Sequence, residues 1–386
     1  MKDYETAGVP VQALVPGHKR RRLQPRSVAG SNPDPLRYGR MQPIALGPNQ
    51  PRQFYKGGEA IAAFRGTQVG DGYRPEDWVG STTPRFGTGT DGLTRLPSGE
   101  YLRDVVSADP EGWLGPEHAA YFGASTALLV KLLDAGERLP VHVHPNRSFA
   151  FRHLGSRHGK TESWVVIGTR GAEPVVHLGW VRDVGEDELR RWVSDQDAKA
   201  MLGNLHRLTV AQGDTVVVPA GTPHAIGEGV FAVELQEPTD FSVMLEFAGF
   251  EIDPAGGDLG LGRDLAISCV QRRALSQAAL DDLVRRTTPA GKAPVESALS
   301  IEASPYFRAE RIRPNSAAAA LEPSFAVLVV LEGAGEIAGQ GWQLPLRAGQ
   351  TWAMPWASGH ATVAGNIELL RCLPPLPADA SADSPL

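Results

Sequence analysis

Two stretches decide the fold of this chain: residues 136–144 read GERLPVHVH, and residues 213–226 read GDTVVVPAGTPHAI. In the second stretch a turn glycine precedes a short apolar strand, a proline that ends the strand, a tight turn and a histidine. The same pattern returns at residues 349–362 (GQTWAMPWASGHAT), with Gly, Thr, Pro, His and Ala at matching positions. This repeat predicts two homologous β-units.

The composition around these stretches also favours strands. The 386 residues include 43 Gly and 31 Pro, and short β-branched runs lie between these turn residues. The runs that we expect to be strands are 128–133, 163–167, 215–218, 230–236 and 326–331. Two stretches have the residue types and apolar spacing of helices instead, 187–205 and 275–286. The sequence therefore predicts a mainly β fold with helical insertions.

Charge and cysteine content exclude several classes of protein. With 42% hydrophobic and 21% charged residues the chain has a globular composition, and its net charge of −6 makes a nucleic-acid partner unlikely. Its two cysteines, Cys269 and Cys372, are too few for a disulfide framework or a CxxC zinc site. No apolar run is long enough to span a membrane, and the first residues lack the apolar region of a signal peptide. We therefore expect a cytoplasmic protein without a membrane partner.

Three histidines and one glutamate form the candidate metal site. His142 and His144 are two residues apart, so on a strand both imidazoles lie on one face. Glu162 begins the next apolar strand, and His224 follows the glycine–proline turn of the first repeat copy. Three imidazoles and one carboxylate suit a divalent transition metal with room for a substrate oxygen.

These motifs resemble those of a known superfamily. The combination Gly-x5-His-x-His and Gly-x5-Pro-x-Gly-x2-His is similar to the paired motifs of the cupins, small antiparallel β-barrels with a metal in the lumen. Within the cupins, the chain resembles class I mannose-6-phosphate isomerases. The segments that carry this resemblance are 127–146 (ALLVKLLDAGERLPVHVHPN), 159–164 (GKTESW), 219–227 (PAGTPHAIG), 234–236 (ELQ) and, more weakly, 76–81 (EDWVGS).

The resemblance implies a bicupin, two β-sandwich or jelly-roll barrels with helical insertions. The expected parts are a Pro/Arg-rich N-terminal extension (1–50), a metal-binding cupin domain (51–268) with a helical insertion at 186–205, a helical connector (269–298), a degenerate second cupin (299–373) and a disordered tail (374–386). The basic run at residues 19–22 is expected to be a solvated arm or a targeting or nucleic-acid contact.

The resemblance also implies an aldose–ketose isomerase that converts mannose 6-phosphate to fructose 6-phosphate through a cis-enediol. The substrate partner is then a small sugar or sugar phosphate. Three alternatives remain open: an isomerase of a free or different sugar, a cupin oxygenase, and a sugar-binding protein that is not an enzyme. The sequence leaves the oligomeric state undetermined.

Two positions depart from the family pattern. His142 stands where the family has a glutamine ligand, so zinc is the first expectation while Fe, Mn, Ni and Cu remain compatible with the ligand set. Met244 stands where the family has an arginine used in substrate handling and catalysis. A cation that would stabilise an enediolate or bind a phosphate is lost at that position.

The remaining candidate residues surround the metal ligands in sequence. We expect Lys160, two residues before Glu162, to project beside a metal-bound substrate. Polar residues of strand 230–236 and of the segment after it would face the lumen or its mouth. The predicted catalytic residues are Lys160, Glu237 and Asp240, and the predicted substrate-binding residues are Arg147, His158, Glu234 and Gln236.

Overall fold

The computed structural model describes residues 41–172, 174–253, 256–287, 293–314 and 317–380. All of these belong to one compact unit. The basic run at residues 19–22 and the last residues of the expected tail, 381–386, lie outside the described residues. None of the helices in the described ranges is long and apolar enough to cross a membrane.

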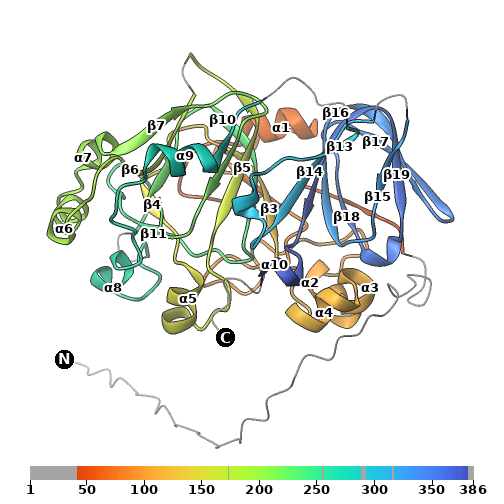
Figure 1. Cartoon of the computed structure of the whole chain (residues 1–386), viewed down its shortest axis with the longest axis horizontal. Coiled ribbons are helices and arrows are strands. Elements are labelled where there is room, and N and C mark those ends of the chain that lie inside the picture. Colours follow the sequence, from red (N-terminus) through yellow and green to blue (C-terminus); the bar gives the residue numbers. More distant parts are fainter. Residues whose placement is uncertain (1–40, 173, 254–255, 288–292, 315–316, 381–386) are drawn as a thin grey trace, which may run out of the picture. The chain divides into compact units, whose positions relative to one another are not determined.

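The fold is mainly β, as predicted, and its strands form three antiparallel sheets (Figure 1). The strands of the six-stranded sheet are, in order, β12 (Val284–Arg285), β8 (Thr215–Val218), β5 (Glu162–Thr169), β10 (Val230–Gln236), β3 (Leu129–Asp134) and β2 (Glu76–Val79). Those of the five-stranded sheet are β11 (Val243–Met244), β4 (His142–Val143), β9 (His224–Ile226), β6 (Val175–Trp180) and β7 (Leu205–Thr209).

The third sheet contains the strands of the second repeat copy. Its order is β1 (Ile44–Leu46), β18 (Thr351–Met354), β16 (Ala326–Gly339), β19 (Ala361–Leu373), β14 (Arg308–Ile312) and β13 (Val295–Ser297), with β15 (Ala319–Leu321) on β19 and β17 (Trp342–Arg347) on β16. β1 therefore joins a sheet of C-terminal strands, although residues 1–50 were expected to be an extension.

The helices are α1 (Glu59–Arg65), α2 (Leu102–Ala108), α3 (Pro110–Leu114), α4 (Pro116–Phe122), α5 (Arg147–Leu154), α6 (Glu186–Asp195), α7 (Ala198–Gly203), α8 (Arg263–Ile267), α9 (Gln277–Leu283), α10 (Pro377–Ala380) and the short 3₁₀ turns η2 (Ile301–Ala303) and η3 (Trp356–Ser358).

The repeat seen in the sequence has a structural counterpart. Gly213 precedes β8 and Gly349 precedes β18, and both adopt positive φ angles, 93° and 84°. A side chain at either position would be strained in this left-handed conformation, which explains why both copies begin with glycine. After each strand the chain turns and reaches a histidine, His224 in the first copy and His360 in the second.

Each of the five expected strands is present, but both expected helices are shorter than predicted. The first is broken at Gln196, whose φ of 54° ends α6, and Asp197 caps α7 through a bond from the backbone N–H of Ala200. The second ends at Leu283 because Val284 and the next residue pair with β8. In both cases a local signal for helix is overridden by a cap or by strand pairing.

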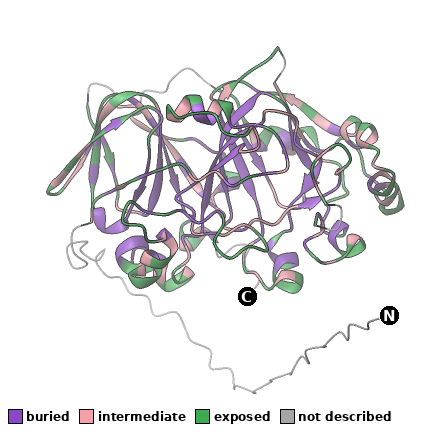
Figure 2. Ribbon diagram, turned by 180° about the vertical axis from the view of Figure 1, so that it is seen from behind, coloured by how far each residue is buried: buried purple, intermediate pink, exposed green. Residues whose placement is uncertain are grey.

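The six-stranded sheet contains the residues that position the site. Every residue of β10 is buried, and Figure 2 shows most of the strand surfaces as buried. The register places Glu234 of β10 opposite Trp164 of β5 and opposite Lys131 of β3. Charged side chains therefore lie inside the sheet structure, where they need partners.

Candidate metal site and cavity

The three histidines of the sequence motif come together on neighbouring strands. His142 on β4 and His224 on β9 are directly opposite each other, and His144 follows β4. Their ring centroids are 4.1 to 5.0 Å apart, and one nitrogen of each lies within 4.8 Å of the other two. All three rings are buried. The predicted convergence of these imidazoles is therefore present in the structure.

Backbone carbonyls fix the tautomer of each ring. The Nδ1 atoms of His142, His144 and His224 each lie 2.8 Å from a carbonyl oxygen, those of Pro140, Phe241 and Thr222 respectively. A carbonyl oxygen only accepts, so each Nδ1 must carry the proton. Each Nε2 then presents a lone pair, which is the form that binds a metal.

The carboxylate of Glu162 lies against these lone pairs. Its Oε2 is 2.9 Å from Nε2 of His144, and its Oε1 is 3.3 Å from Nε2 of His224. Trp164 donates its indole N–H to Oε1 at 3.0 Å and thereby orients the carboxylate. Because nitrogen and oxygen are both acceptors here, no proton joins them, and Oε2 of Glu162 and Nε2 of His224 have no hydrogen-bond partner. Two buried acceptors that lack a hydrogen-bond donor, one on Glu162 and one on His224, fit a divalent cation between them.

The pKa values of these groups agree with that protonation state. Burial lowers the pKa of His142 well below its usual range and, with the adjacent Lys160, lowers the pKa of His144 to about 3. Burial alone would raise the pKa of Glu162, but the positive charge of the adjacent Lys160 holds it below its usual range. Near neutral pH His142 and His144 are therefore neutral and Glu162 is ionised.

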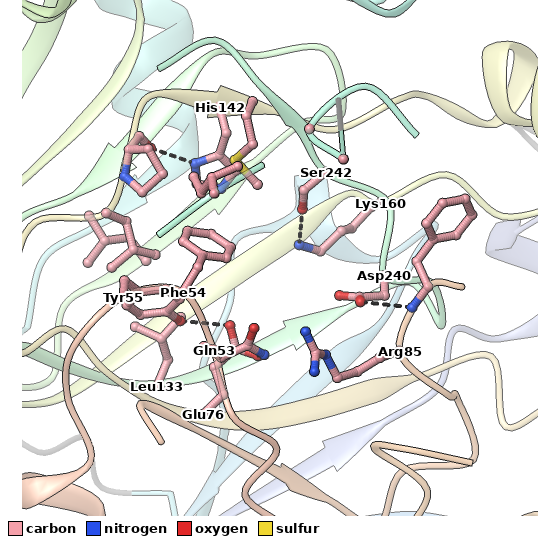
Figure 3. Close-up of a pocket in the computed structure, with 18 of the residues that line it drawn as sticks. Gln53, Phe54, Tyr55, Glu76, Arg85, Leu133, His142, Lys160, Asp240 and Ser242 are labelled. Atoms are coloured by element: carbon pink, nitrogen blue, oxygen red, sulfur yellow. Dashed lines mark hydrogen bonds between the residues drawn. The ribbon is translucent and has the colours of Figure 1, made fainter. Parts of the chain in front are cut away.

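Lys160 extends the site toward a neighbouring cavity. Its Nζ is 3.1 Å from Nε2 of His144, 3.4 Å from Oε2 of Glu162 and 3.4 Å from Oγ of Ser242. The side chain is buried, and it projects beside the metal ligands as its sequence spacing predicted (Figure 3). Lys160 therefore places a positive charge beside the histidine–glutamate group.

The cavity next to the histidine cluster has a volume of about 510 Å³. His142, Glu162 and Lys160 contribute to its wall, together with Asp240 and Glu234. These are five of the residues that the sequence analysis singled out. A cavity of this size accommodates a ligand as large as a sugar phosphate.

The deep wall of the cavity holds a second charged network that the sequence analysis missed. Nζ of Lys131 is 3.3 Å from Oε2 of Glu76 and 3.4 Å from Oε1 of Glu234, and it lies over the ring of Trp78. Glu76 also accepts hydrogen bonds from Gln53 at 2.9 Å, from Tyr55 at 2.7 Å and from Trp78 at 2.7 Å (Figure 3). One signal was available: Lys131 is the only basic residue in the apolar run 128–133.

Burial changes the protonation of the acidic residues in the cavity. It raises the pKa of Glu234 to about 7, although Lys131 opposes the shift. Burial also raises the pKa of Asp240 above its usual range, although the charge of Lys131 opposes this shift. Two carboxyl groups of the cavity are therefore able to hold a proton more readily than an exposed carboxylate.

Four of the predicted site residues do not line this cavity. Glu237 accepts a 2.6 Å hydrogen bond from Nε of Arg147 and a 3.0 Å bond from the backbone N–H of Thr161, and His158 lies 4.0 Å away. The amide of Gln236 donates to the carbonyl oxygen of Thr239. None of Arg147, His158, Gln236 and Glu237 is among the described residues that line the cavity.

Met244 lies beside the histidine cluster. It is opposite His142 in the pairing of β11 with β4, and its side chain is part of the cavity wall. The wall is therefore uncharged at the position where the family pattern has a cation.

Comparisons with known proteins agree with the motifs. No family model matches the chain. The chain is 25% identical over 323 residues to mannose-6-phosphate isomerase ManA of Bacillus subtilis, an alignment that covers 81% of this chain and 93% of that relative. It is 35% identical over 140 residues to a mannose-6-phosphate isomerase of Streptococcus mutans, covering 35% of this chain and 42% of that relative.

Solved structures show the same fold. The mannose 6-phosphate isomerase of Bacillus subtilis superposes with a TM-score of 0.61 at 23% identity, covering 86% of this chain and 99% of that one. A mannose 6-phosphate isomerase bound with zinc and yttrium superposes with a TM-score of 0.65 at 15% identity, covering 87% of this chain and 100% of that one. The resemblance indicated by the sequence motifs is thus confirmed over most of the chain.

Proposed function

We propose that this chain, which is related to the mannose-6-phosphate isomerases, is a metal-dependent aldose–ketose isomerase that interconverts mannose 6-phosphate and fructose 6-phosphate through a cis-enediol. One observation carries the proposal. Three imidazole lone pairs and the carboxylate of Glu162 converge at the wall of a cavity into which Lys160 also projects. Sugar isomerisation needs a group that polarises two oxygens and a group that moves a proton between two carbons.

His142, His144, Glu162 and His224 would hold the metal. A divalent ion bound there would polarise the C1 and C2 oxygens of an open-chain sugar. We expect zinc, because a related fold binds it, while imidazole ligands are also compatible with Fe, Mn, Ni or Cu.

Lys160, Glu234 and Asp240 are the proposed proton-handling and substrate-orienting residues. All three line the cavity. Glu234, with a pKa raised to about 7, is able to accept and return a proton near neutral pH. Lys160 would donate hydrogen bonds to substrate oxygens beside the metal, and Asp240 would orient a hydroxyl group. We assign Glu237, Arg147, His158 and Gln236 to the support of this site and no longer to contact with substrate.

The architecture that we propose is a bicupin. Residues 51–268 would form the metal-binding barrel with its insertion at 186–205, residues 269–298 the connector, and residues 299–373 the degenerate second barrel. The histidine of the second repeat copy, His360, is exposed and pairs with the exposed Glu322 at 3.3 Å. It therefore lacks the burial expected of a metal ligand. We further propose a cytoplasmic enzyme, since both cysteines are buried and free.

Metal analysis combined with NMR of mannose 6-phosphate in deuterated water tests the proposal. We expect near-stoichiometric metal, fructose 6-phosphate as the product, and deuterium at C1 or C2. His224→Ala and Glu162→Gln should each lose metal and activity together, whereas His360→Ala should change neither. Isomerisation that continues unchanged after the metal has been lost from either site variant would refute the proposal.

A second candidate substrate is an unphosphorylated sugar. Met244 favours it, because the cavity wall has no cation at the position where the family resemblance implies an arginine. Turnover of free mannose or another free sugar, with no activity on its phosphate, would select this candidate. Oxygen uptake would instead indicate the oxygenase that a three-histidine site also allows.

A further inference from the structure

The charges around the cavity are closely balanced. Among the described residues that line it, six are carboxylates and four are cations. A divalent metal ion at the histidine site would cancel the acidic excess. Binding of a phosphate dianion in this cavity therefore requires a positively charged side chain next to the phosphate, because the overall charge of the walls does not attract it.

Three of the four cations are already engaged within the cavity. Lys131 is enclosed by Glu76 and Glu234, and its side chain is only 3% exposed. Lys160 lies against the metal ligands. Arg52 pairs with Glu251, another residue of the cavity wall, and its guanidinium stacks over the ring of Tyr73.

Arg85 differs from these three because its counter-ion does not belong to the cavity wall. Nη1 donates to Asp91 at 2.9 Å, and Asp91 is half exposed on the same loop. No other hydrogen bond of the Arg85 guanidinium is formed within the described part of the chain, and the side chain is 30% exposed. Figure 3 shows the guanidinium pointing into the cavity on the side of Asp240.

The loop that carries Arg85 is held in place at the cavity. The backbone N–H of Phe86 donates to Oδ2 of Asp240 at 3.0 Å, and the ring of Phe86 contacts that of Phe241 edge to face at 5.6 Å. The backbone N–H of Arg85 donates to the carbonyl oxygen of Asp91 at 2.7 Å. The backbone of Arg85 is thus fixed while its guanidinium keeps free donors.

We propose that Arg85 binds the phosphate group of the substrate and so supplies, from a different loop, the cation that is missing at Met244. The inference rests on the proposed function and specifies a residue that selects phosphorylated over free sugars. A guanidinium stays charged at every physiological pH and binds phosphate through two parallel N–H donors. Met244 and Arg85 both line the cavity, so a guanidinium at position 85 is able to reach the same substrate as one at position 244 would.

Calorimetric titration of the metal-loaded protein with mannose 6-phosphate, with mannose and with inorganic phosphate tests this role directly. Arg85→Gln should weaken mannose 6-phosphate binding about 30- to 100-fold, the range for a lost charge-assisted hydrogen-bond pair. It should leave mannose binding and metal content unchanged. Arg85→Lys should lose less, because a lysine keeps the charge without the paired donors.

Two further variants make the test specific. Arg95→Gln is the matched control: Arg95 is an exposed arginine that contacts Tyr101 outside the cavity wall, so its loss should have no effect. Arg85→Gln combined with Met244→Arg should recover phosphate selectivity, because it returns a guanidinium to another position of the same cavity wall.

The outcomes separate this inference from the proposed function. The role of Arg85 would be overturned if the affinity of Arg85→Gln for mannose 6-phosphate stays within threefold of the wild-type value. It would also be overturned if the affinities for mannose and for mannose 6-phosphate fall equally. If the wild-type protein isomerises a free sugar but binds no phosphorylated ligand, the inference fails while isomerase activity stands. If it binds mannose 6-phosphate through Arg85 but turns over no sugar, the inference stands and the proposed function fails.

Discussion

At the scale of single residues, His142 has the most specific consequence, because the family resemblance implies a glutamine ligand at this position. His142→Gln should keep a metal site, since an amide oxygen also coordinates divalent ions. We expect the affinity for zinc to fall about tenfold and that for Ni or Cu to fall more, because imidazole suits these metals better than an amide oxygen does. Chelator competition measures both affinities. His360→Gln is the control, and unchanged metal affinities in His142→Gln would show that His142 is not a ligand.

Glu234 should give the metal-free protein a characteristic pH dependence. Its pKa is raised from 4.5 to about 7 by burial, so between these values the folded state holds a proton that the unfolded state has lost. The stabilisation is complete below about pH 4.5, is lost as the pH rises through about 7, and is on the order of 3 kcal/mol. Urea unfolding at about pH 5 and about pH 8 measures it.

Glu234→Gln should remove this pH dependence, because an amide does not titrate. The exposed Glu302→Gln should preserve it. The prediction is contradicted if the stability of Glu234→Gln falls between the two pH values as steeply as that of the wild-type protein.

The sequence predicted that the three histidines and Glu162 come together because their signal is local. Two histidines at alternate strand positions, a strand-initial glutamate and a turn histidine suffice to place four side chains. Lys131, Glu76 and Arg85 escaped prediction because they meet the site only through the pairing of β2 with β3 and through a loop contact with Asp240. Such long-range contacts leave no periodic pattern in one sequence.

At the scale of the elements, α5 and the end of β10 are joined by a buried ion pair. Arg147 begins α5, Glu237 follows β10, and both side chains are at most 10% exposed. Arg147 also donates to the carbonyl oxygen of Pro305 and lies over the ring of Tyr306. The backbone N–H of Thr161 donates to Oε2 of Glu237, and the backbone N–H of Glu237 donates to the carbonyl oxygen of Thr161, both at 3.0 Å. The pair therefore holds the residue between Lys160 and Glu162.

Removing one partner of this pair should be more damaging than removing both. Arg147→Met or Glu237→Gln alone leaves a buried group without its partner and should cost about 3 to 5 kcal/mol of unfolding free energy. The double variant should cost less than the sum of the single ones. Urea unfolding measures the cycle, and metal affinity provides a second measurement because Thr161 is adjacent to Glu162. Additive single costs with unchanged metal affinity would argue against this role.

Strand alternation explains why Arg147 and Glu237 do not line the cavity. Lys160 and Glu162 project toward the histidines, so Thr161 between them projects the other way, and Glu237 and Arg147 lie on that side. The sequence motifs predicted that Arg147 and Glu237 lie near Glu162. They show neither which side of the strand the segment after β10 reaches nor where α5 packs.

At the scale of the whole described chain, N-terminal and C-terminal residues share one sheet. Ile44–Leu46 pair with Thr351–Met354, and Arg65 connects Asp77 at 2.6 Å to Oγ1 of Thr351 at 2.9 Å. Both members of the Arg65–Asp77 pair are buried. The metal-binding part and the C-terminal sheet are therefore not independent pieces.

We expect this shared sheet to produce a single thermal transition in calorimetry. Arg65→Met should lower the stability by about 3 kcal/mol or more, because it leaves Asp77 buried without a cation. The exposed Arg103→Met is the matched control, since its pairing with Asp104 is at the surface. Two well-separated transitions in the wild-type protein would show that the parts unfold independently.

The carbonyl contacts of the three site histidines have a consequence for metal exchange. Because Pro140, Phe241 and Thr222 hold the rings through backbone bonds, the ligand geometry exists before any ion arrives. The ion then binds to a protein that is already folded and is not required for folding, in contrast to small zinc domains that unfold on chelation. Chelation should leave the circular dichroism spectrum unchanged, and added metal should reload the site without a refolding delay.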